Sequence, residues 1–344
     1  MIQKRVCVFL LGVGVLVPAN VWPETTSEVT VIPIGNLARY DDSLDAAWSP
    51  KGAEVAAATQ TGLYVYRLED ETTSRIVSPF FDDLNMDTNF GDLRWSPDGD
   101  RIAFSWKEGG PTAAYPENIW IVNNDGNELR RLTNSAVYIQ SREEDKEGRM
   151  IALQKSTHFR SPCWGPGGKA ILYVMYEVID SQTDAEKSHR IFQRWVMSMN
   201  LMTGIQSVVS EISSPGPVSL LAYRMESNEV FYWTDQLYAL SLQSGVGTSE
   251  TVRIVQSGKG QNQARALASR LTSPQQKFAT TEDGKIEVLD PDSGATHEIS
   301  VAGLVAGERI SRCIASPTGN RILVELESPK GHRTLHRLGI VTVP

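Results

Sequence analysis

The stretch that decides the fold is residues 93–104, which read LRWSPDGDRIAF. An apolar segment ends at a Trp, a Ser-Pro-Asp-Gly segment turns the chain, and an alternating apolar run leads away. Pro97 fixes φ in the turn, Asp98 can accept a hydrogen bond from the backbone ahead, and Gly99 tolerates a positive φ. The pattern therefore predicts two antiparallel strands joined by a tight turn.

Variants of this stretch recur along the chain, so it is the unit of an internal repeat. Clear copies are AAWSPKGAEVAA at residues 46–57, PCWGPGGKAILY at 162–173 and CIASPTGNRILV at 313–324. Weaker copies are LAYRMESNEVFY at 221–232 and the shortened RLTSPQQKFA at 270–279. We number these copies repeats 1 to 6 in chain order, with residues 93–104 in repeat 2.

Most repeats continue with a third strand, such as NIWIV at 118–122, and a fourth, such as ELRRL at 128–132. Four antiparallel strands in about 40–50 residues are typical of a β-propeller blade. The turn positions from Pro50 to Pro317 are spaced by 47, 69, 59, 49 and 43 residues. The sequence therefore predicts an all-β, six-bladed propeller of four-stranded antiparallel blades.

The first twenty residues have the pattern of a secretory signal peptide. Lys4 and Arg5 precede an apolar run from Val6 to Val17, and Ala19 offers a small residue for cleavage. The run is shorter than the ~20 residues that span a membrane, and an uncleaved N-terminal anchor is the alternative. Cleavage near Ala19 predicts a periplasmic or secreted protein with no membrane span in its mature form.

The ends of the chain suggest how the ring closes. Repeat 6 runs out one strand short of four, and the strand-like segment EVTVIPI at about 28–34 precedes repeat 1. We expect this segment to pair with the last blade, which removes an open edge. The expected organisation is a signal peptide at 1–19, an N-terminal segment at 20–44 with the closing strand, and the propeller at 45–344.

Composition and charge narrow the function. The chain has 344 residues, 41% of them hydrophobic, and a formal net charge of −8, which falls to −10 without Lys4 and Arg5. An acidic protein does not suit phosphate-driven binding, so no nucleic-acid partner is expected. Beyond the signal segment, Cys163 and Cys313 are the two cysteines, and their places in repeats 3 and 6 predict separate buried thiols.

The stretch W-S-P-D-G-x-R-I-A-F from Trp95, with N-I-W-I-V-N-N-D-G-N-E-L-R-R-L-T from Asn118, resembles the repeat of the TolB-type β-propellers. These are relatives of the WD-repeat propellers. The resemblance covers nearly all of residues 45–344 and implies the propeller fold. It departs from TolB itself, because the small α/β domain that precedes the propeller there has no counterpart here.

Long connections predict where a partner binds. In a propeller, the loops between second and third strands and those between blades lie on one face, and long loops on a rigid scaffold often carry binding sites. The long segments of this kind are residues 79–91, 108–117, 134–160 and 179–190. We expect a protein or peptide partner there. Because aromatic residues and arginine dominate contact energies, the candidate binding residues are Tyr115, Tyr138, His158 and Arg160.

No metal or cofactor is expected, although two patterns resemble metal-ligand sets. Asp83, Asn85 and Asp87 have the spacing of a calcium loop, but Thr88 and Arg94 replace its glycine and glutamate, so a solvated acidic loop is the alternative. His332 and His336 would lie about 13 Å apart on one strand, too far to chelate an ion. We interpret them as ordinary surface histidines.

Catalytic motifs are missing from the sequence. It contains no G-x-S-x-G, H-E-x-x-H or C-x-x-C. The hypothesis is therefore a non-catalytic binding scaffold in the periplasm or cell envelope, with the recurrent Trp48, Trp95 and Trp164 as core between blades. The alternative is a propeller enzyme, a lyase or glycan hydrolase, with carboxylates and His158 or His189 at the mouth of the central channel. The oligomeric state is not predicted.

Overall fold

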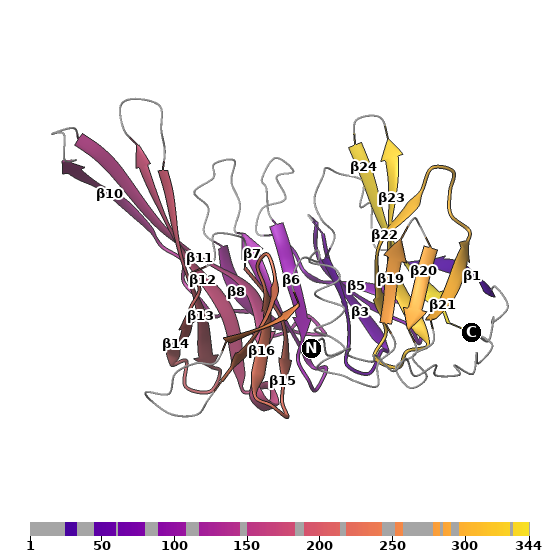
Figure 1. The fold of residues 1–344 in the computed structure, drawn as a ribbon. Coiled ribbons are helices and arrows are strands. Elements are labelled where there is room, and N and C mark those ends of the chain that lie inside the picture. The colour runs from indigo at the N-terminus through magenta and orange to yellow at the C-terminus, as the bar shows by residue number, and fades with distance from the viewer. Residues whose placement is uncertain are drawn as a thin grey trace, which may run out of the picture.

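The structure is a computed structural model that describes residues 25–32, 45–59, 61–79, 89–107, 117–144, 150–182, 189–213, 218–242, 252–256, 278–282, 285–289, 296–330 and 333–343. Within these residues the protein is built of strands, which form five sheets (Figure 1). The helical element of the described part is a three-residue 3-10 turn, η1 (Pro166–Gly168).

Repeats 1, 2 and 4 each form the four-stranded antiparallel sheet that the sequence predicts. Repeat 1 contains β2 (Asp45–Trp48), β3 (Glu54–Thr59), β4 (Gly62–Arg67) and β5 (Thr72–Val77). Repeat 2 contains β6 (Asn89–Trp95), β7 (Arg101–Lys107), β8 (Glu117–Asn123) and β9 (Arg130–Arg131). Repeat 4 contains β15 (Ser219–Arg224), β16 (Glu229–Trp233), β17 (Leu237–Ser241) and β18 (Val252–Gln256).

Repeat 3 departs from the expected unit, because its sheet has five strands and three of them are long. The strands are β10 (Val137–Glu144), β11 (Met150–Trp164), β12 (Ala170–Gln182), β13 (His189–Asn200) and β14 (Gln206–Glu211). Strands β11 to β13 have 12 to 15 residues, against seven at most in repeats 1 and 2. Their ends project beyond the neighbouring sheets, at the upper left of Figure 1, and with β10 they form what we call the arm.

The arm corrects the expectation of loops at 134–160 and 179–190. Residues 137–144 and 150–160 of the first segment are strand, and so are residues 179–182 and 189–190 of the second. Ala152 of the first segment lies opposite Gln182 of the second, and within the second Ser181 lies opposite His189. These ladders satisfy backbone hydrogen bonds that an isolated loop would leave to water. Of the other two long segments, residues 80–88 and 108–116 lie outside the described part of the chain.

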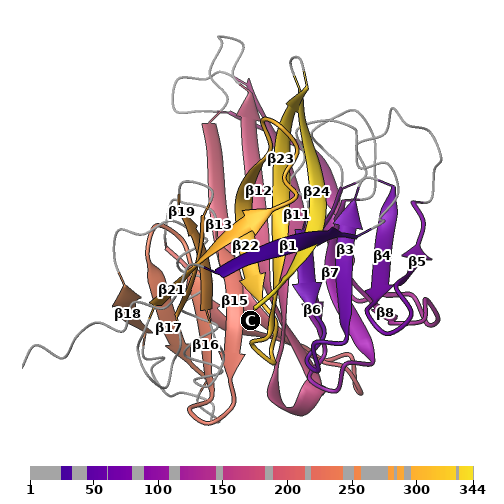
Figure 2. The same ribbon diagram turned by 90° about the vertical axis from the view of Figure 1, so that its right-hand side faces the viewer.

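Repeats 5 and 6 share one seven-stranded sheet, which contains β1 (Thr25–Val31). The other strands are β19 (Phe278–Glu282), β20 (Lys285–Leu289), β21 (Thr296–Ala302), β22 (Arg309–Ala315), β23 (Arg321–Lys330) and β24 (Arg333–Thr342). The first half of β1 pairs in parallel with β21 and the second half pairs antiparallel with β24 (Figure 2). The strand expected at about 28–34 thus lies at 25–31 and contacts two repeats, whereas the sequence predicted contact with one.

The predicted tight turn is confirmed in detail. In repeat 2, the Ser96 N–H donates to the Arg101 carbonyl at 2.8 Å, and the Gly99 N–H donates to the Ser96 carbonyl at 2.9 Å. Gly99 has a φ of 84°, which suits glycine. The same two bonds form in repeats 1 and 6, at Ser49 and Ser316.

The recurrent tryptophans join neighbouring repeats, as the sequence predicts. The indole Nε1 of Trp95 donates to the Ala47 carbonyl at 3.0 Å. Trp164 donates in the same way to Arg94 at 2.9 Å, and Trp48 to Ile314 at 2.9 Å. Each acceptor directly precedes the Trp position of the adjoining repeat, so one hydrogen bond recurs at three junctions: 6 with 1, 1 with 2 and 2 with 3.

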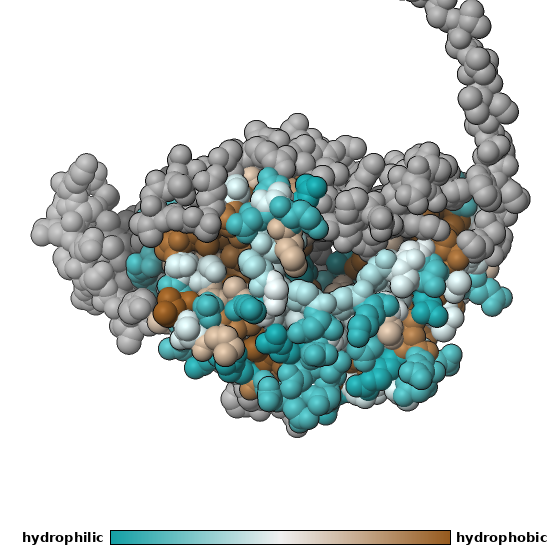
Figure 3. Space-filling model, turned by 90° about the horizontal axis from the view of Figure 1, so that it is seen from below, coloured by the Kyte–Doolittle hydropathy of each residue, from teal (hydrophilic) through white to brown (hydrophobic). Residues whose placement is uncertain are grey.

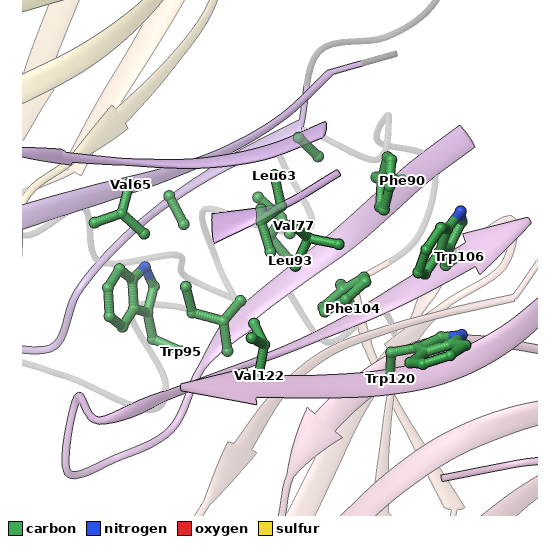
Figure 4. Close-up of a cluster of buried hydrophobic side chains, with 13 residues drawn as sticks. Leu63, Val65, Val77, Phe90, Leu93, Trp95, Phe104, Trp106, Trp120 and Val122 are labelled. Carbon is green, nitrogen blue, oxygen red and sulfur yellow. The ribbon is translucent and has the colours of Figure 1, made fainter. Parts of the chain in front are cut away.

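Apolar clusters fill these three junctions and two others. Between repeats 1 and 2, Leu63 and Val65 of β4 pack with Phe90, Trp95 and Phe104 (Figure 4). Corresponding clusters join repeats 6 and 1, 2 and 3, 3 and 4, and 5 and 6. The core thus runs without a break from repeat 5 through 6, 1, 2 and 3 to repeat 4. Among the described residues, no such cluster joins repeat 4 to repeat 5.

The two described cysteines are free thiols, as predicted. Cys163 is buried and Cys313 is half-buried. Burial raises the pKa of the Cys163 thiol to about 11 and that of the Cys313 thiol to about 12. Neither is a reactive thiolate near neutral pH.

Trp95→Phe tests the inter-repeat hydrogen bond. It keeps an aromatic ring but leaves the Ala47 carbonyl without its donor, so we expect a loss of about 1–2 kcal/mol in the free energy of unfolding. The matched control is Trp233→Phe, because the Trp233 indole nitrogen has no hydrogen-bond partner among the described residues. Urea unfolding measures both variants. Equal losses would show that the N–H donated by Trp95 contributes nothing.

Thiol labelling tests the packing of the cysteines. In a Cys7→Ala background at pH 8, a chromogenic disulfide reagent should label neither remaining thiol within minutes, because both carry raised pKa values and limited exposure. Both should react after unfolding in denaturant. An intact mass two hydrogens lower, with no labelling after unfolding, would instead reveal a disulfide.

Candidate functional site

Two of the four candidate binding residues lie at the base of the arm. His158 and Arg160 are two positions apart on β11 and therefore project from the same side of it. Tyr138 lies on β10, where its backbone pairs with Lys155, but its side chain lies outside the described part. Tyr115 and the acidic segment with Asp83, Asn85 and Asp87 also lie outside it.

Arg160 forms an ion pair with Glu117, the first residue of β8. The Arg160 Nε donates to the Glu117 Oε2, so the pair joins repeat 3 to repeat 2. Glu117 is only 7% exposed. Burial raises the pKa of its carboxyl, and the Arg160 guanidinium opposes that rise. Arg160 is thus the counter-ion of a buried carboxylate as well as a candidate contact residue.

Asp92 adds a second link between the same repeats. It adopts a φ of 55° at a bulge in β6, which turns its carboxylate toward β7 and β11. There the Oδ2 accepts hydrogen bonds from the Ser105 hydroxyl and the Ser161 N–H, both at 3.0 Å. Asp45, at the same position of repeat 1, accepts the Leu93 N–H at 2.7 Å.

This role of aspartate was not predicted from the sequence. The available signal was an Asp three residues before the Trp in repeats 1 and 2. Its partner is a backbone N–H of the next repeat, however, and no side-chain pattern in the sequence marks such a donor.

Tyr176 and Arg94 connect this region to repeat 4. The Tyr176 hydroxyl donates to the Val218 carbonyl at 2.6 Å, and Arg94 donates to the Leu220 carbonyl at 3.2 Å. Burial raises the pKa of Tyr176 to about 12, so its phenol is neutral at pH 7. Arg194 lies over the Tyr176 ring, with its guanidinium carbon 6.0 Å from the ring centre. We name Asp92, Glu117, Arg160, Tyr176 and Arg194 the arm-base cluster.

The polar groups of the arm-base cluster bind one another and the neighbouring strands. Its carboxylates accept hydrogen bonds from Ser105, Ser161 and Arg160, and the Tyr176 hydroxyl donates to the Val218 carbonyl. A general acid or base needs to reach a substrate proton, whereas these groups hold strands of repeats 2, 3 and 4 together. The imidazole Nε2 of His158 lies 3.1 Å from the Ser156 hydroxyl on the same strand. The side chain of His189 lies outside the described residues.

His336 corrects the prediction of a surface histidine. Its side chain is only 14% exposed, and its Nδ1 lies 3.0 Å from the Glu325 Oε1 and 3.9 Å from the Glu327 Oε1. The strand register explains this, because β23 and β24 pair antiparallel and place Glu327 opposite His336. His332, considered with it in the sequence, lies outside the described part.

No helix within the described ranges is long and apolar enough to cross a membrane.

Arg160→Ala tests the ion pair at the base of the arm. It leaves a buried carboxylate unpaired, and we expect a loss of about 2 kcal/mol in unfolding free energy at pH 7, less than for a fully buried pair because Arg160 is exposed. Burial keeps the folded pKa of Glu117 above its unfolded value. The penalty should therefore shrink as the pH falls toward 4 and the carboxyl becomes protonated.

The double variant Glu117→Gln/Arg160→Ala is the control, since it removes the charge that Arg160 neutralises. Urea unfolding at pH 7 should show it to be more stable than Arg160→Ala alone. A loss for Arg160→Ala that is equal at pH 4 and pH 7 would contradict the assignment.

Comparison with known proteins gives matches at low identity and low TM-score. No protein-family model matches the chain, and no curated protein sequence matches it. A TolB-assigned structure from Agrobacterium tumefaciens is 14% identical over 88% of this chain and 90% of that one, with a TM-score of 0.42. The C-terminal WD40 domain of Sif2 is 13% identical over 93% of this chain and 99% of that one, with a TM-score of 0.37. An oligogalacturonate lyase from Vibrio parahaemolyticus is 12% identical over 90% and 80%, with a TM-score of 0.29.

Proposed function

We propose that the protein is an exported, six-bladed β-propeller that binds a protein or peptide partner with its arm and the strand ends beside it, without catalysis of its own. The observation that carries the proposal is the arm. Within the described residues, the arm departs most from the four-stranded repeat, and it projects beyond the neighbouring sheets.

The arm is long and braced. At a rise of about 3.3 Å per residue, a 13-residue strand such as β12 extends roughly 20 Å further than a seven-residue strand of repeat 2. Lys155 and Glu177 form an ion pair at 2.8 Å across β11 and β12. Strand β10 is at the edge of its sheet, and such an edge can pair with an extended segment of a partner through backbone hydrogen bonds.

Strand ends of repeat 2 lie beside the arm. Lys107 at the end of β7 pairs with Glu117 at the start of β8, and Glu117 contacts Arg160 on β11. The connection between β7 and β8 therefore leaves from the base of the arm, where the sequence predicts a binding face. The opposite end carries the tight turns, and hydrophilic side chains make up much of its described surface (Figure 3).

The proposal of a six-bladed ring rests on the continuous packing between successive repeats. Packing runs from repeat 5 to repeat 4 through the 6–1 junction, where Trp48 reaches Ile314. Strand β1 supplies the fourth strand of repeat 6 and also holds repeat 5. Contact between repeats 4 and 5, whose linking residues 257–277 lie outside the described part, would complete the ring.

Export is supported by the N-terminal sequence. Two basic residues, an apolar run and Ala19 form a signal-peptide pattern. Because β1 begins at Thr25, cleavage near Ala19 would leave this strand intact. The partner would then be met in the periplasm or outside the cell.

A truncated arm tests the binding proposal. Tyr138, Lys155, Ile179 and Ile191 are successive cross-strand partners, so they mark one level across four strands. Replacing residues 139–154 and 180–190 each by an Asn-Gly turn shortens all four strands at that level. We expect this variant to fold with a similar melting temperature and to lose the partners that the wild type captures from envelope extracts.

The control is Met202→Ser/Ile205→Ser, which alters exposed residues at the other end of the same sheet. It should capture the same partners as the wild type. If the truncated arm also captures them unchanged, the partner-binding role of the arm is wrong.

A further inference from the structure

Glu325, Glu327 and His336 form a second polar cluster, away from the arm. The two glutamates are two positions apart on β23 and therefore project from the same face, and His336 faces them from β24. One ligand atom from each of the three lies within 4.8 Å of the others. The two strands pair over ten residues, which fixes the positions from which these side chains project.

The surroundings leave this cluster with excess negative charge. Arg309 donates to the Oε2 of Glu327 at 2.9 and 3.1 Å, so the Oε1 is the oxygen that faces His336. Arg312 lies on the same side of β22 as Arg309 and pairs with Asp45 of repeat 1 at 3.3 Å. Among the described residues, Arg309 and Arg312 thus face the carboxylates of Asp45, Glu325 and Glu327, so the group is net negative when the His336 imidazole is neutral, as a metal ligand must be.

Burial makes that charge costly. The side chains of Glu325, Glu327 and His336 are 11%, 18% and 14% exposed. A carboxylate in such a setting needs a counter-charge, and an imidazole beside two carboxylates is a set of donors that a cation can use.

We propose that Glu325, Glu327 and His336 bind a divalent transition-metal cation, for which zinc fits the donors best. Calcium and magnesium favour oxygen ligands alone, whereas a site with one imidazole and two carboxylates suits zinc and its neighbours in the first transition row. Ligands about 2.1 Å from one ion lie roughly 3.0–3.4 Å apart, and the Nδ1 of His336 is 3.0 Å from the Glu325 Oε1. The Glu327 Oε1, at 3.9 Å, would move slightly inward.

The cluster lies on a hairpin that contacts both repeat 1 and strand β1. Leu323 and Leu338, which share the cluster's side of β23 and β24, pack in the apolar core between repeats 6 and 1. Arg312 reaches repeat 1 beside them. Strand β24 also pairs with β1. A bound ion would therefore stiffen the hairpin on which both contacts depend, and three protein ligands would leave a further position for water.

Titration of the untagged wild-type protein with Co²⁺ tests the proposal, because Co²⁺ substitutes for zinc and reports its ligands by absorbance. We expect one equivalent to bind with the visible bands of nitrogen and oxygen ligands, without the thiolate band that Cys163 or Cys313 would give. Zn²⁺ should displace the Co²⁺, and Mg²⁺ and Ca²⁺ should not.

Glu327→Gln and His336→Gln should each weaken Zn²⁺ binding about tenfold or more in calorimetric titration. Glu177→Gln, which removes a paired carboxylate from repeat 3, is the control and should bind as the wild type does. Melting in EDTA shows whether the variants fold. If they do not, the Co²⁺ spectrum of the wild type decides. No stoichiometric binding, a thiolate spectrum, or folded variants that bind like the wild type would each overturn the proposal.

Discussion

An indole N–H donated across a repeat junction is the interaction on which the rest of the structure depends. Trp48, Trp95 and Trp164 fill the space between adjacent sheets and also satisfy a carbonyl of the neighbouring innermost strand. An unsatisfied buried carbonyl costs free energy, so the bond favours one position of each sheet against the next. Asp45 and Asp92, three residues earlier in the strand, add a second bond across a junction, in which the carboxylate accepts a backbone N–H of the next repeat.

Repeats 4 and 6 lack the Trp and join their neighbours through other residues. Repeat 4 has Tyr223 at the Trp position, and it packs against the cluster with Cys163 while its hydroxyl bonds Asn228 in its own repeat. Repeat 6 has Ala315 there and Arg312 at the Asp position, and the arginine pairs with Asp45. The junction of repeats 6 and 1 is thus joined by an indole hydrogen bond and an ion pair. Both departures preserve contact between sheets by other means.

Local features of the fold could be predicted from the sequence, and features set by distant pairing could not. The turn at Pro97 to Gly99 and the core role of Trp95 follow from residues close in the chain. Segment 134–160 was expected to be a long loop, yet much of it forms strands, because it pairs with segments of the same repeat that are distant in the sequence. His336 was interpreted wrongly because its neighbours, Glu325 and Glu327, come from the facing strand at a register that the sequence does not display. His158 and Arg160 were predicted in a long loop but lie on strand β11, and the buried partner of Arg160, Glu117, was not foreseen.

The central claim is that strand β1 joins repeats 5 and 6 and so connects the N-terminal segment to the last repeat. Gly339 permits its close approach: a Cβ there would lie 2.4 Å from the Val29 Cγ1. Amide hydrogen exchange of peptides covering residues 25–32, 296–302 and 333–343 tests this pairing most directly. The account predicts that residues 25–32 are protected on the same time scale as the two strands beside them. Exchange of residues 25–32 within seconds, while 333–343 stay protected, would contradict it.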